Sequence, residues 1–312
     1  MIADDEIQQA IADNKADAVS MSFGGPENLN VALGYINAQG TGVGQIEMAS
    51  LAAEGIATFV SSGDDGAWEC FDPNTGAPLG TACVSYPASD PNVVAVGGVN
   101  IPLDGSGNLT GTITAWADNT TLGGNGAFVN NVGSGGGVST VFAAPKWQSA
   151  ALGASMRLLP DWSLDADPNT GPSIFITGFP FAIGGTSASA PESAAMWALV
   201  LQACKASSSC NKGGATGYRL GNPNPLIYAI YAKSNPLSAA YTPAGFTAQL
   251  GYSNVFYDVV VGNNQAVPSP NAPQPATTPV GYNSGPGYDQ VTGVGAPFAG
   301  HLIQAVTGTQ VP

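Results

Sequence analysis

The chain has 312 residues, of which 7 are Lys or Arg and 21 are Asp or Glu, so its formal net charge at pH 7 is −14. So few basic residues exclude nucleic acid as a partner, because neutralising phosphates requires Lys and Arg. A hydrophobic content of 44% argues against disorder, and no apolar run is long enough to span a membrane. The low share of charged residues, 9%, fits a protein that works in acid and equally a secreted neutral-pH protein with an acidic surface.

The first part of the chain alternates amphipathic patterns with short apolar runs. The spacing predicts a helix over 4–14, a buried strand over 16–22, a second helix over 45–54 and a second strand over 56–61. A third strand is expected over 93–97. This order of strand, helix and strand predicts an α/β fold, with a parallel sheet between helices.

The rest of the chain is less regular. Residues 100–137 are rich in Gly, Asn and Thr and predict short β segments. The longest helical pattern, over 187–204, is apolar almost all round and should be buried. Two shorter helices are expected over 224–233 and 297–307, and the Pro-rich stretch 262–284 reads as a surface loop.

Four cysteines indicate an oxidising compartment, and they allow three pairings. We expect the two local pairs, Cys70–Cys83 and Cys204–Cys210, each closing a polar loop. Metal binding by these residues is disfavoured, because the spacing contains no C-x₂-C motif and no cluster of histidines. Residues 1–6 have neither the basic nor the apolar region of a signal peptide, so we expect a mature form, a fragment or a chain that is not secreted.

The sharpest motif is GGTSASAP over 184–191. Ser187 opens the predicted buried helix, where the field of the helix N-terminus and free amides suit a nucleophile whose oxyanion is stabilised. An ordinary serine N-cap is the alternative. Pro191 is compatible with this helix if it falls in the first turn, where amides lack intrahelical partners.

The string 185–191 resembles the serine motif that subtilisin-like peptidases share with the sedolisins, which are serine-carboxyl peptidases. A subtilisin-like enzyme uses a histidine that precedes its serine. The one histidine here, His301, follows Ser187 and is read as a surface or packing residue. The sedolisin pattern extends from about residue 4 to the end, and its further matching segments are 20–25, 61–66, 69–70, 86–89, 94–98, 135–139, 145–148 and 159–161.

The resemblance implies that 1–312 form a sedolisin-like peptidase domain with a subtilisin-like parallel sheet flanked by helices. It assigns Ser187 as the nucleophile and Asp64 to the oxyanion hole. A protonated carboxyl donates a hydrogen bond to an oxyanion, whereas an ionised one repels it, so this assignment implies activity in acid. The alternative is an Asp that caps a turn or a helix.

The resemblance also implies substrate-binding residues in two segments, 22–25 and 62–69. Asp65 and Glu69 are equally explained as solvated loop acids, and the sequence does not decide between the two roles. The full predicted set is Ser22, Phe23, Gly24, Gly25, Ser62, Gly63, Asp65 and Glu69.

Residues 254–295 resemble the sedolisin calcium site. By that resemblance one Ca²⁺ would take the carboxylates of Asp258 and Asp289 and the carbonyls of Val259, Gly285 and Gly287, with water completing the shell. Without the resemblance, two aspartates in turns are the simpler explanation.

The departure from the family concerns the base, which in sedolisins is a Glu followed four residues later by an Asp. No Glu of this chain has an Asp at that distance. We therefore expect a domain that is truncated at its N-terminus and inactive, or nearly so, on its own. The complete protein would supply the missing part and a propeptide.

The predicted function is a secreted, monomeric, serine-type acid endopeptidase that acts on proteins or peptides. The first alternative is a non-catalytic, calcium-stabilised remnant or binding module. A weaker alternative is a subtilisin-like neutral protease that uses His301.

Overall fold

The computed structural model describes residues 2–70, 72, 74–75, 79, 81–121, 128–234, 250–265 and 280–310. Its centre is a sheet of parallel strands in the order β1-β3-β5-β11, with the short β6 (Thr114–Ala115) pairing antiparallel with β5. The expected parallel sheet is therefore confirmed. Its four parallel strands are β1 (Ala18–Met21), β3 (Ala57–Ser61), β5 (Val94–Asn100) and β11 (Trp162–Asp165).

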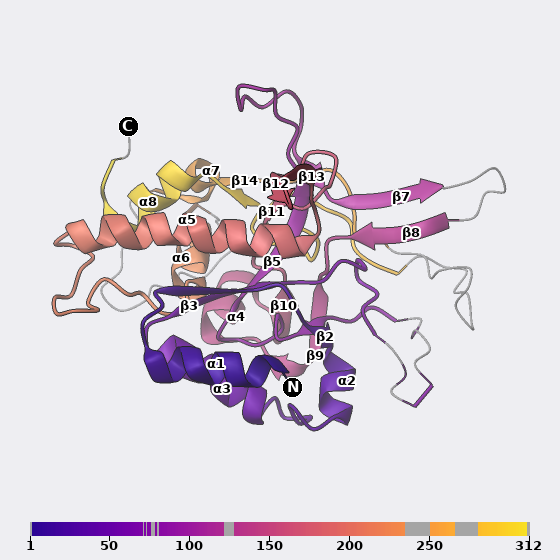
Figure 1. The fold of residues 1–312 in the computed structure, drawn as a ribbon, viewed down its shortest axis with the longest axis horizontal. Coiled ribbons are helices and arrows are strands. Elements are labelled where there is room, and N and C mark those ends of the chain that lie inside the picture. The colour runs from indigo at the N-terminus through magenta and orange to yellow at the C-terminus, as the bar shows by residue number, and fades with distance from the viewer. Residues whose placement is uncertain are drawn as a thin grey trace.

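Helices cover both faces of this sheet (Figure 1). α1 (Ile2–Asp13) and α3 (Val43–Ala53) pack together on one face, and α5 (Thr186–Ala206) runs across all four parallel strands on the other. Because both faces are buried, the strands are short, continuous apolar runs, which is why the sequence revealed three of them. β11, with the sequence WSLD, was not predicted, because its apolar and polar residues do not form a continuous apolar run.

Side chains of the strands alternate between two hydrophobic clusters, one on each face of the sheet. Phe59 belongs to the cluster beneath α5, together with Trp162 and Trp197. The next residue, Val60, belongs to the cluster beneath α1 and α3, with Met48. Hydrophobic packing on both faces therefore holds the sheet in place, and with it the ends of its strands.

The remaining elements are short and include all the other expected helices. α6 (Asn224–Ser234) and α8 (Ala299–Thr307) match the predicted spans closely, and α2 (Glu27–Ala32), α4 (Lys146–Leu152) and α7 (Tyr252–Val255) were not predicted. Among the described residues, two-stranded sheets are formed by β2 (Gly25–Pro26) with β4 (Ser85–Tyr86), β7 (Ala117–Thr121) with β8 (Phe128–Gly133), β9 (Gly137–Ala143) with β10 (Met156–Leu159), β12 (Ser173–Ile176) with β13 (Phe179–Ala182), and β14 (Phe256–Tyr257) with β15 (Ala296–Pro297).

Both expected disulfides are present, Cys70–Cys83 and Cys204–Cys210. Of the predicted loop 262–284, residues 266–279 lie outside the described part. None of the described helices combines the length and the apolar character needed to cross a bilayer.

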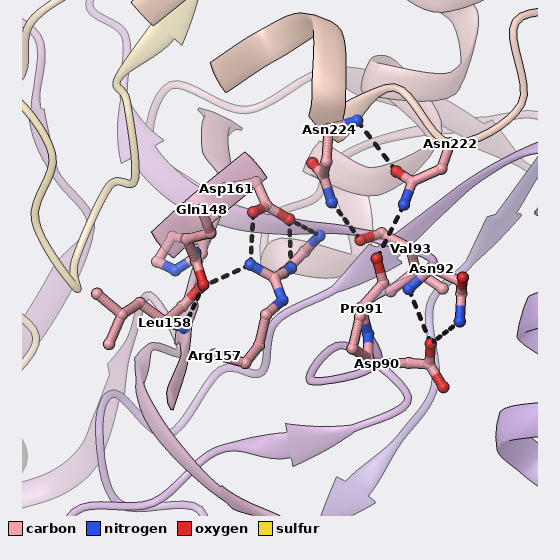
Figure 2. Close-up of polar contacts among 12 residues, drawn as sticks. Asp90, Pro91, Asn92, Val93, Gln148, Arg157, Leu158, Asp161, Asn222 and Asn224 are labelled. Atoms are coloured by element: carbon pink, nitrogen blue, oxygen red, sulfur yellow. Dashed lines mark hydrogen bonds and ion pairs between the residues drawn. The ribbon is translucent and has the colours of Figure 1, made fainter. Parts of the chain in front are cut away.

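A buried ion pair joins several of these elements (Figure 2). Arg157 and Asp161 are fully buried, and two guanidinium nitrogens of Arg157 each donate a hydrogen bond of 2.6 Å to the Asp161 carboxylate. Arg157 also donates to the carbonyl of Leu158 at 2.7 Å. The carboxylate receives two more hydrogen bonds, from the amide of Ala95 at 2.8 Å and from the hydroxyl of Tyr228 at 3.0 Å. The pair thus connects β10, β5 and α6 at the start of β11.

Beside this pair, two asparagines attach the start of α6 to the turn before β5. The side-chain amide of Asn222 donates to the carbonyl of Pro91 at 2.8 Å, and that of Asn224 donates to the carbonyl of Val93 at 2.7 Å (Figure 2). Both carbonyls belong to non-helical backbone, whose buried groups need such partners.

Candidate active site

The first turn of α5 meets the carboxyl ends of β1, β3 and β11, where ligand sites of open α/β sheets lie. The loop after β3 carries Asp64, the loop after β1 carries Ser22, and both contact α5. The hydroxyl of Ser189 can donate to either of two carbonyls at the end of β11, those of Leu164 at 3.1 Å and Asp165 at 2.9 Å. Three strand ends therefore fix the position of this helix N-terminus.

Asp64 caps α5. Its Oδ1 accepts hydrogen bonds from the amide of Thr186 at 2.7 Å and from the hydroxyl of Thr186 at 2.9 Å. Gly185, which precedes the helix, has a φ of 84°, and a Cβ there would stand 2.6 Å from Asp64 Oδ2. The capping alternative is thus realised, and capping is also what brings the carboxyl beside Ser187.

Ser187 is the second residue of α5 and is exposed. Within the described part of the chain, neither its amide nor its hydroxyl has a protein hydrogen-bond partner. A first-turn amide has no acceptor inside its own helix, so this N–H remains available to a ligand. A carbonyl oxygen placed here would meet the amide of Ser187 beside the carboxyl of Asp64.

The structure corrects the expectation for Pro191. Because α5 begins at Thr186, Pro191 is its sixth residue, beyond the first-turn amides that lack partners. A residue here would ordinarily donate its N–H to the carbonyl of Ser187, and proline has no N–H. The hydroxyl of Ser22 donates to that carbonyl instead, at 2.8 Å.

Glu69 lies beneath the Asp64 loop and is only 6% exposed. Its Oε2 accepts a hydrogen bond of 2.7 Å from the Ser85 hydroxyl, and its Oε1 accepts one of 3.3 Å from the Asp65 amide. Gly63, at φ 117°, packs against the carboxyl group so closely that a Cβ there would lie 1.9 Å from Oε1. Glu69 therefore supports the loop from below, and its predicted direct contact with substrate is not favoured by this burial.

Burial raises the pKa values of Glu69 and of its neighbour Asp65. It raises the pKa of Glu69 to about 8, with a further upward contribution from Asp65. Loss of hydration and the nearby Asp64 carboxyl also raise the pKa of Asp65. Glu69 is thus neutral throughout the acid range.

A second pair of acids lies further along the same edge of the sheet. Burial raises the pKa of Asp165, at the end of β11, to about 6. Burial and the neighbouring Asp165 raise the pKa of Glu192, on α5, to about 7. The surroundings of the α5 N-terminus therefore carry less negative charge in acid than at neutral pH.

The predicted substrate-binding residues Phe23, Gly24 and Gly25, called the substrate wall below, line a pocket of about 280 Å³. Phe23 is 46% exposed at its edge, and Ser22, Gly24 and Asp65 are exposed as well. Of the other predicted residues, Ser62 and Glu69 are buried, and Gly25 and Gly63 are half-buried. The lining is mostly apolar and consists of Ile7, Phe23, Gly24, Gly25, Leu29, Asn30, Leu33, Tyr35, Met48, Tyr86 and Pro87.

The structure brings Asp258 against the 285–289 segment, so that the predicted calcium ligands of these two segments are neighbours. The amide of Gly287 donates to the Asp258 carboxylate at 3.0 Å, and the amide of Gly285 donates to Asp289 Oδ2 at 2.9 Å. No described backbone amide donates to the carbonyls of Val259, Gly285 or Gly287.

Two carboxylates and three free carbonyls are the oxygen donors that Ca²⁺ prefers, so these residues fit the ion. Among the described residues no three carboxylate, imidazole or thiolate groups are grouped for a metal. A calcium ion here would therefore depend on the backbone carbonyls.

Two contributors escaped the sequence reasoning. Thr186 holds Asp64 through both its amide and its hydroxyl, and it lies inside the motif around Ser187. Its position at the helix start was the available signal. Ser85 holds Glu69 and pairs with Pro26 across β2 and β4, so it links the loop to the substrate wall. No sequence pattern indicates that long-range contact.

Comparisons with known proteins identify the family that the chain is similar to. The sequence model of a protein family, described as the subtilase family, matches residues 1–212. Sedolisin of Pseudomonas sp. (strain 101) is 34% identical over 92% of this chain and 40% of its own length. Kumamolisin of Bacillus sp. (strain MN-32) is 31% identical over 94% of this chain and 43% of its own. The chain thus spans less than half of the length of these relatives.

A solved structure of Pseudomonas sedolisin is similar to the fold. It is described as a serine-carboxyl proteinase in complex with two molecules of pseudo-iodotyrostatin. It matches with a TM-score of 0.70 and 31% identity, over 93% of this chain and 65% of the solved chain.

Proposed function

The chain belongs to the subtilase family, with sedolisins among its relatives, and from this membership and the site geometry we propose that it forms the core of a serine-type acid endopeptidase. The observation that carries the proposal is the junction of Asp64 with the first residues of α5. It sets a carboxyl group beside the free amide of Ser187, as an oxyanion hole requires.

In the proposed mechanism the Ser187 hydroxyl attacks the carbonyl carbon of a peptide bond, and the amide of Ser187 holds the resulting oxyanion. Asp64 completes the oxyanion hole. Its Oδ1 is already engaged by Thr186, so the proton of the neutral carboxyl resides on Oδ2 and is donated to the oxyanion. An ionised Asp64 would repel the oxyanion, which restricts activity to acid.

We propose that the base is a Glu–Asp pair on polypeptide outside these 312 residues. The proposal rests on the absence of any Glu with an Asp four residues later in the sequence. Without a base, Ser187 is a weak nucleophile, so the chain alone should hydrolyse peptides very slowly. Protein or peptide substrates would place apolar side chains against Phe23 and the pocket behind it.

His301 does not suit the role of base. Its ring contacts the carbonyl of Asn254. The carbonyl of Thr307, at the end of the same helix, accepts a hydrogen bond from Ser207, which caps the C-terminus of α5. Ser187 lies at the other end of α5, roughly 30 Å from Ser207 along a helix of this length, whereas the helix of His301 packs at the Ser207 end. The neutral, histidine-dependent protease is therefore dropped.

The test compares the 312-residue chain with the complete translation product of its gene. We expect the complete product to hydrolyse denatured protein at about pH 4 and not at about pH 8. Ser187→Ala should abolish hydrolysis, and Asp64→Ala should lower kcat by roughly 10²- to 10³-fold. Full activity at the higher pH, or indifference to Asp64→Ala, contradicts the mechanism.

A second candidate, a non-catalytic binding module, is favoured by the missing Glu–Asp pair. It predicts that the complete product binds denatured protein in acid and never cleaves it. Lack of hydrolysis at every pH, with retained binding, would select this candidate.

We further propose one Ca²⁺, held by the carboxylates of Asp258 and Asp289. The carbonyls of Val259, Gly285 and Gly287 would complete the protein ligands, and the ion would stabilise the fold. We also propose that the protein is secreted and monomeric. The two disulfides support an oxidising compartment.

A further inference from the structure

Ser22 makes a contact that a substrate-binding residue would not need. Its hydroxyl donates to the carbonyl of Ser187 at 2.8 Å, across 165 positions of sequence. This is the carbonyl that α5 leaves without its usual partner, because Pro191 has no N–H. A strand end therefore supplies a hydrogen bond that the helix itself does not make.

We propose that Ser22 is a positioning residue for the nucleophile and that it works as a pair with Pro191. The proline frees the carbonyl of Ser187, and the Ser22 hydroxyl then fixes it. Since this carbonyl defines the backbone torsion of Ser187, the contact fixes the direction in which the Ser187 side chain leaves the backbone. The catalytic consequence rests on the proposed peptidase function, whereas the pairing itself does not.

Each residue around Ser187 has its own anchor. Thr186 is held by Asp64, and Ser189 is held by the carbonyls at the end of β11. Ser187 has Ser22 alone among the described residues. A serine hydroxyl has one hydrogen to donate, so Ser22 does not also donate to a substrate while this contact is made.

A double-mutant cycle on the complete translation product tests the pairing. We expect Ser22→Ala to lower kcat about tenfold with KM unchanged, because the nucleophile is misplaced while substrate binding is retained. Pro191→Ala supplies the missing helical N–H, so the double variant should recover most of the lost kcat. Ser22→Thr keeps the hydroxyl and should retain activity.

Other outcomes overturn the proposal. If Ser22 contacts substrate directly, Ser22→Ala raises KM and Pro191→Ala does not rescue it. If kcat is unchanged in Ser22→Ala, the residue does not position Ser187. The matched control is Ser50→Ala, which removes a hydroxyl-to-carbonyl bond of 2.7 Å in the exposed part of α3, and it should leave kcat unchanged.

Thermal unfolding of the 312-residue chain separates this inference from the proposed function. Ser22→Ala should lower the midpoint by roughly 1–3 °C, the effect of one hydrogen bond, and Pro191→Ala should restore it. Additive shifts in the two variants overturn the pairing even if the protein is an active peptidase. Coupled shifts in a protein that never cleaves a peptide keep the pairing and reject the proposed function.

Discussion

Two regions of the molecule bury carboxyl groups in opposite ways. Asp161 is surrounded by donors, with the guanidinium of Arg157, the amide of Ala95 and the hydroxyl of Tyr228 all directed at it. Glu69 has one hydroxyl and one amide as partners, and its charged neighbours, Asp65 and Asp64, are themselves acids. Similar burial therefore leaves Asp161 with a counter-charge and several donors, whereas Glu69 has no counter-charge and burial raises its pKa.

The difference shows how a chain with 7 basic residues uses them. One of the seven, Arg157, is fully buried against Asp161, where it holds the core elements together. Near the α5 N-terminus, burial without a counter-charge raises the pKa of four acids, which are Asp65, Glu69, Asp165 and Glu192. The scarcity of basic residues therefore matters most at the candidate site, where it makes charge depend on pH.

The largest expected effect concerns the ion pair. Asp161→Asn leaves the buried guanidinium of Arg157 without a counter-charge, and breaking a buried pair in this way costs about 3–5 kcal/mol of unfolding free energy. Urea denaturation at constant pH measures the loss. Asp13→Asn is the matched control, because Asp13 and its partner Lys15, at 3.4 Å, are both exposed. That variant should lose at most about 1 kcal/mol.

Equal losses in the two variants would contradict the contrast between buried and exposed pairs. An Asp161→Asn variant as stable as the parent would mean that water reaches Arg157.

The second effect is the pH dependence that Glu69 gives to stability. Its folded-state pKa of about 8 lies above the ordinary value of 4.5, so the folded protein binds this proton more tightly than the unfolded chain. The contribution to the free energy of unfolding is complete below about pH 4.5 and is lost as the pH rises towards about 8. Glu69→Gln cannot ionise, so it should be more stable than the parent at the upper end of this range, by a few kcal/mol.

Urea denaturation at a series of pH values measures this difference. The same substitution at the exposed Glu6 should leave the pH dependence unchanged. A Glu69→Gln variant with the pH dependence of the parent would show that Glu69 does not titrate as a buried acid.

A third kind of carboxyl environment, the proposed calcium site at Asp258 and Asp289, gives an intermediate effect. If Ca²⁺ binds there, an ion concentration of about 100 times Kd stabilises the fold by about 2.7 kcal/mol, and a chelator removes this. Thermal unfolding with and without chelator measures the shift. Asp258→Asn should abolish it, whereas Asp104→Asn, in an exposed turn held by the amides of Ser106 and Asn108, should not. An unchanged midpoint on chelation would remove the metal assignment.

The sequence predicted the structure where a residue type occurs in only one kind of environment, as apolar runs do in buried strands. Apolar runs predicted β1, β3 and β5, and the motif around Ser187 predicted the nucleophile and, by resemblance, Asp64. Long-range polar contacts left no such pattern. Arg157 and Asp161 are four positions apart across a turn, and nothing in their spacing tells that both point inwards.

Glu69 illustrates the same limit at the candidate site. As an acid in a Gly-rich loop it reads as solvated, yet it is buried beside Trp68 and Cys70. Its two neighbours, an aromatic residue and a disulfide cysteine, were the available signal for burial. The pairing of Ser22 with Pro191 depends on where α5 begins, and helix boundaries are the least predictable part of a fold.

The smallest expected effect tests how the Ser85 hydroxyl acts on the pKa of Glu69. The Ser85 hydroxyl donates to Oε2 and lowers the pKa of Glu69 against the larger effect of burial. Ser85→Ala removes this donor, so it should cost about 1 kcal/mol and move the loss of stability to still higher pH. The variant should therefore differ from the parent least in acid, where Glu69 is neutral in both, and most above about pH 8, where the parent carboxylate is ionised and stabilised by the hydroxyl. A difference that is uniform across pH would mean that Ser85 supports the β2–β4 wall and not the charge state of Glu69.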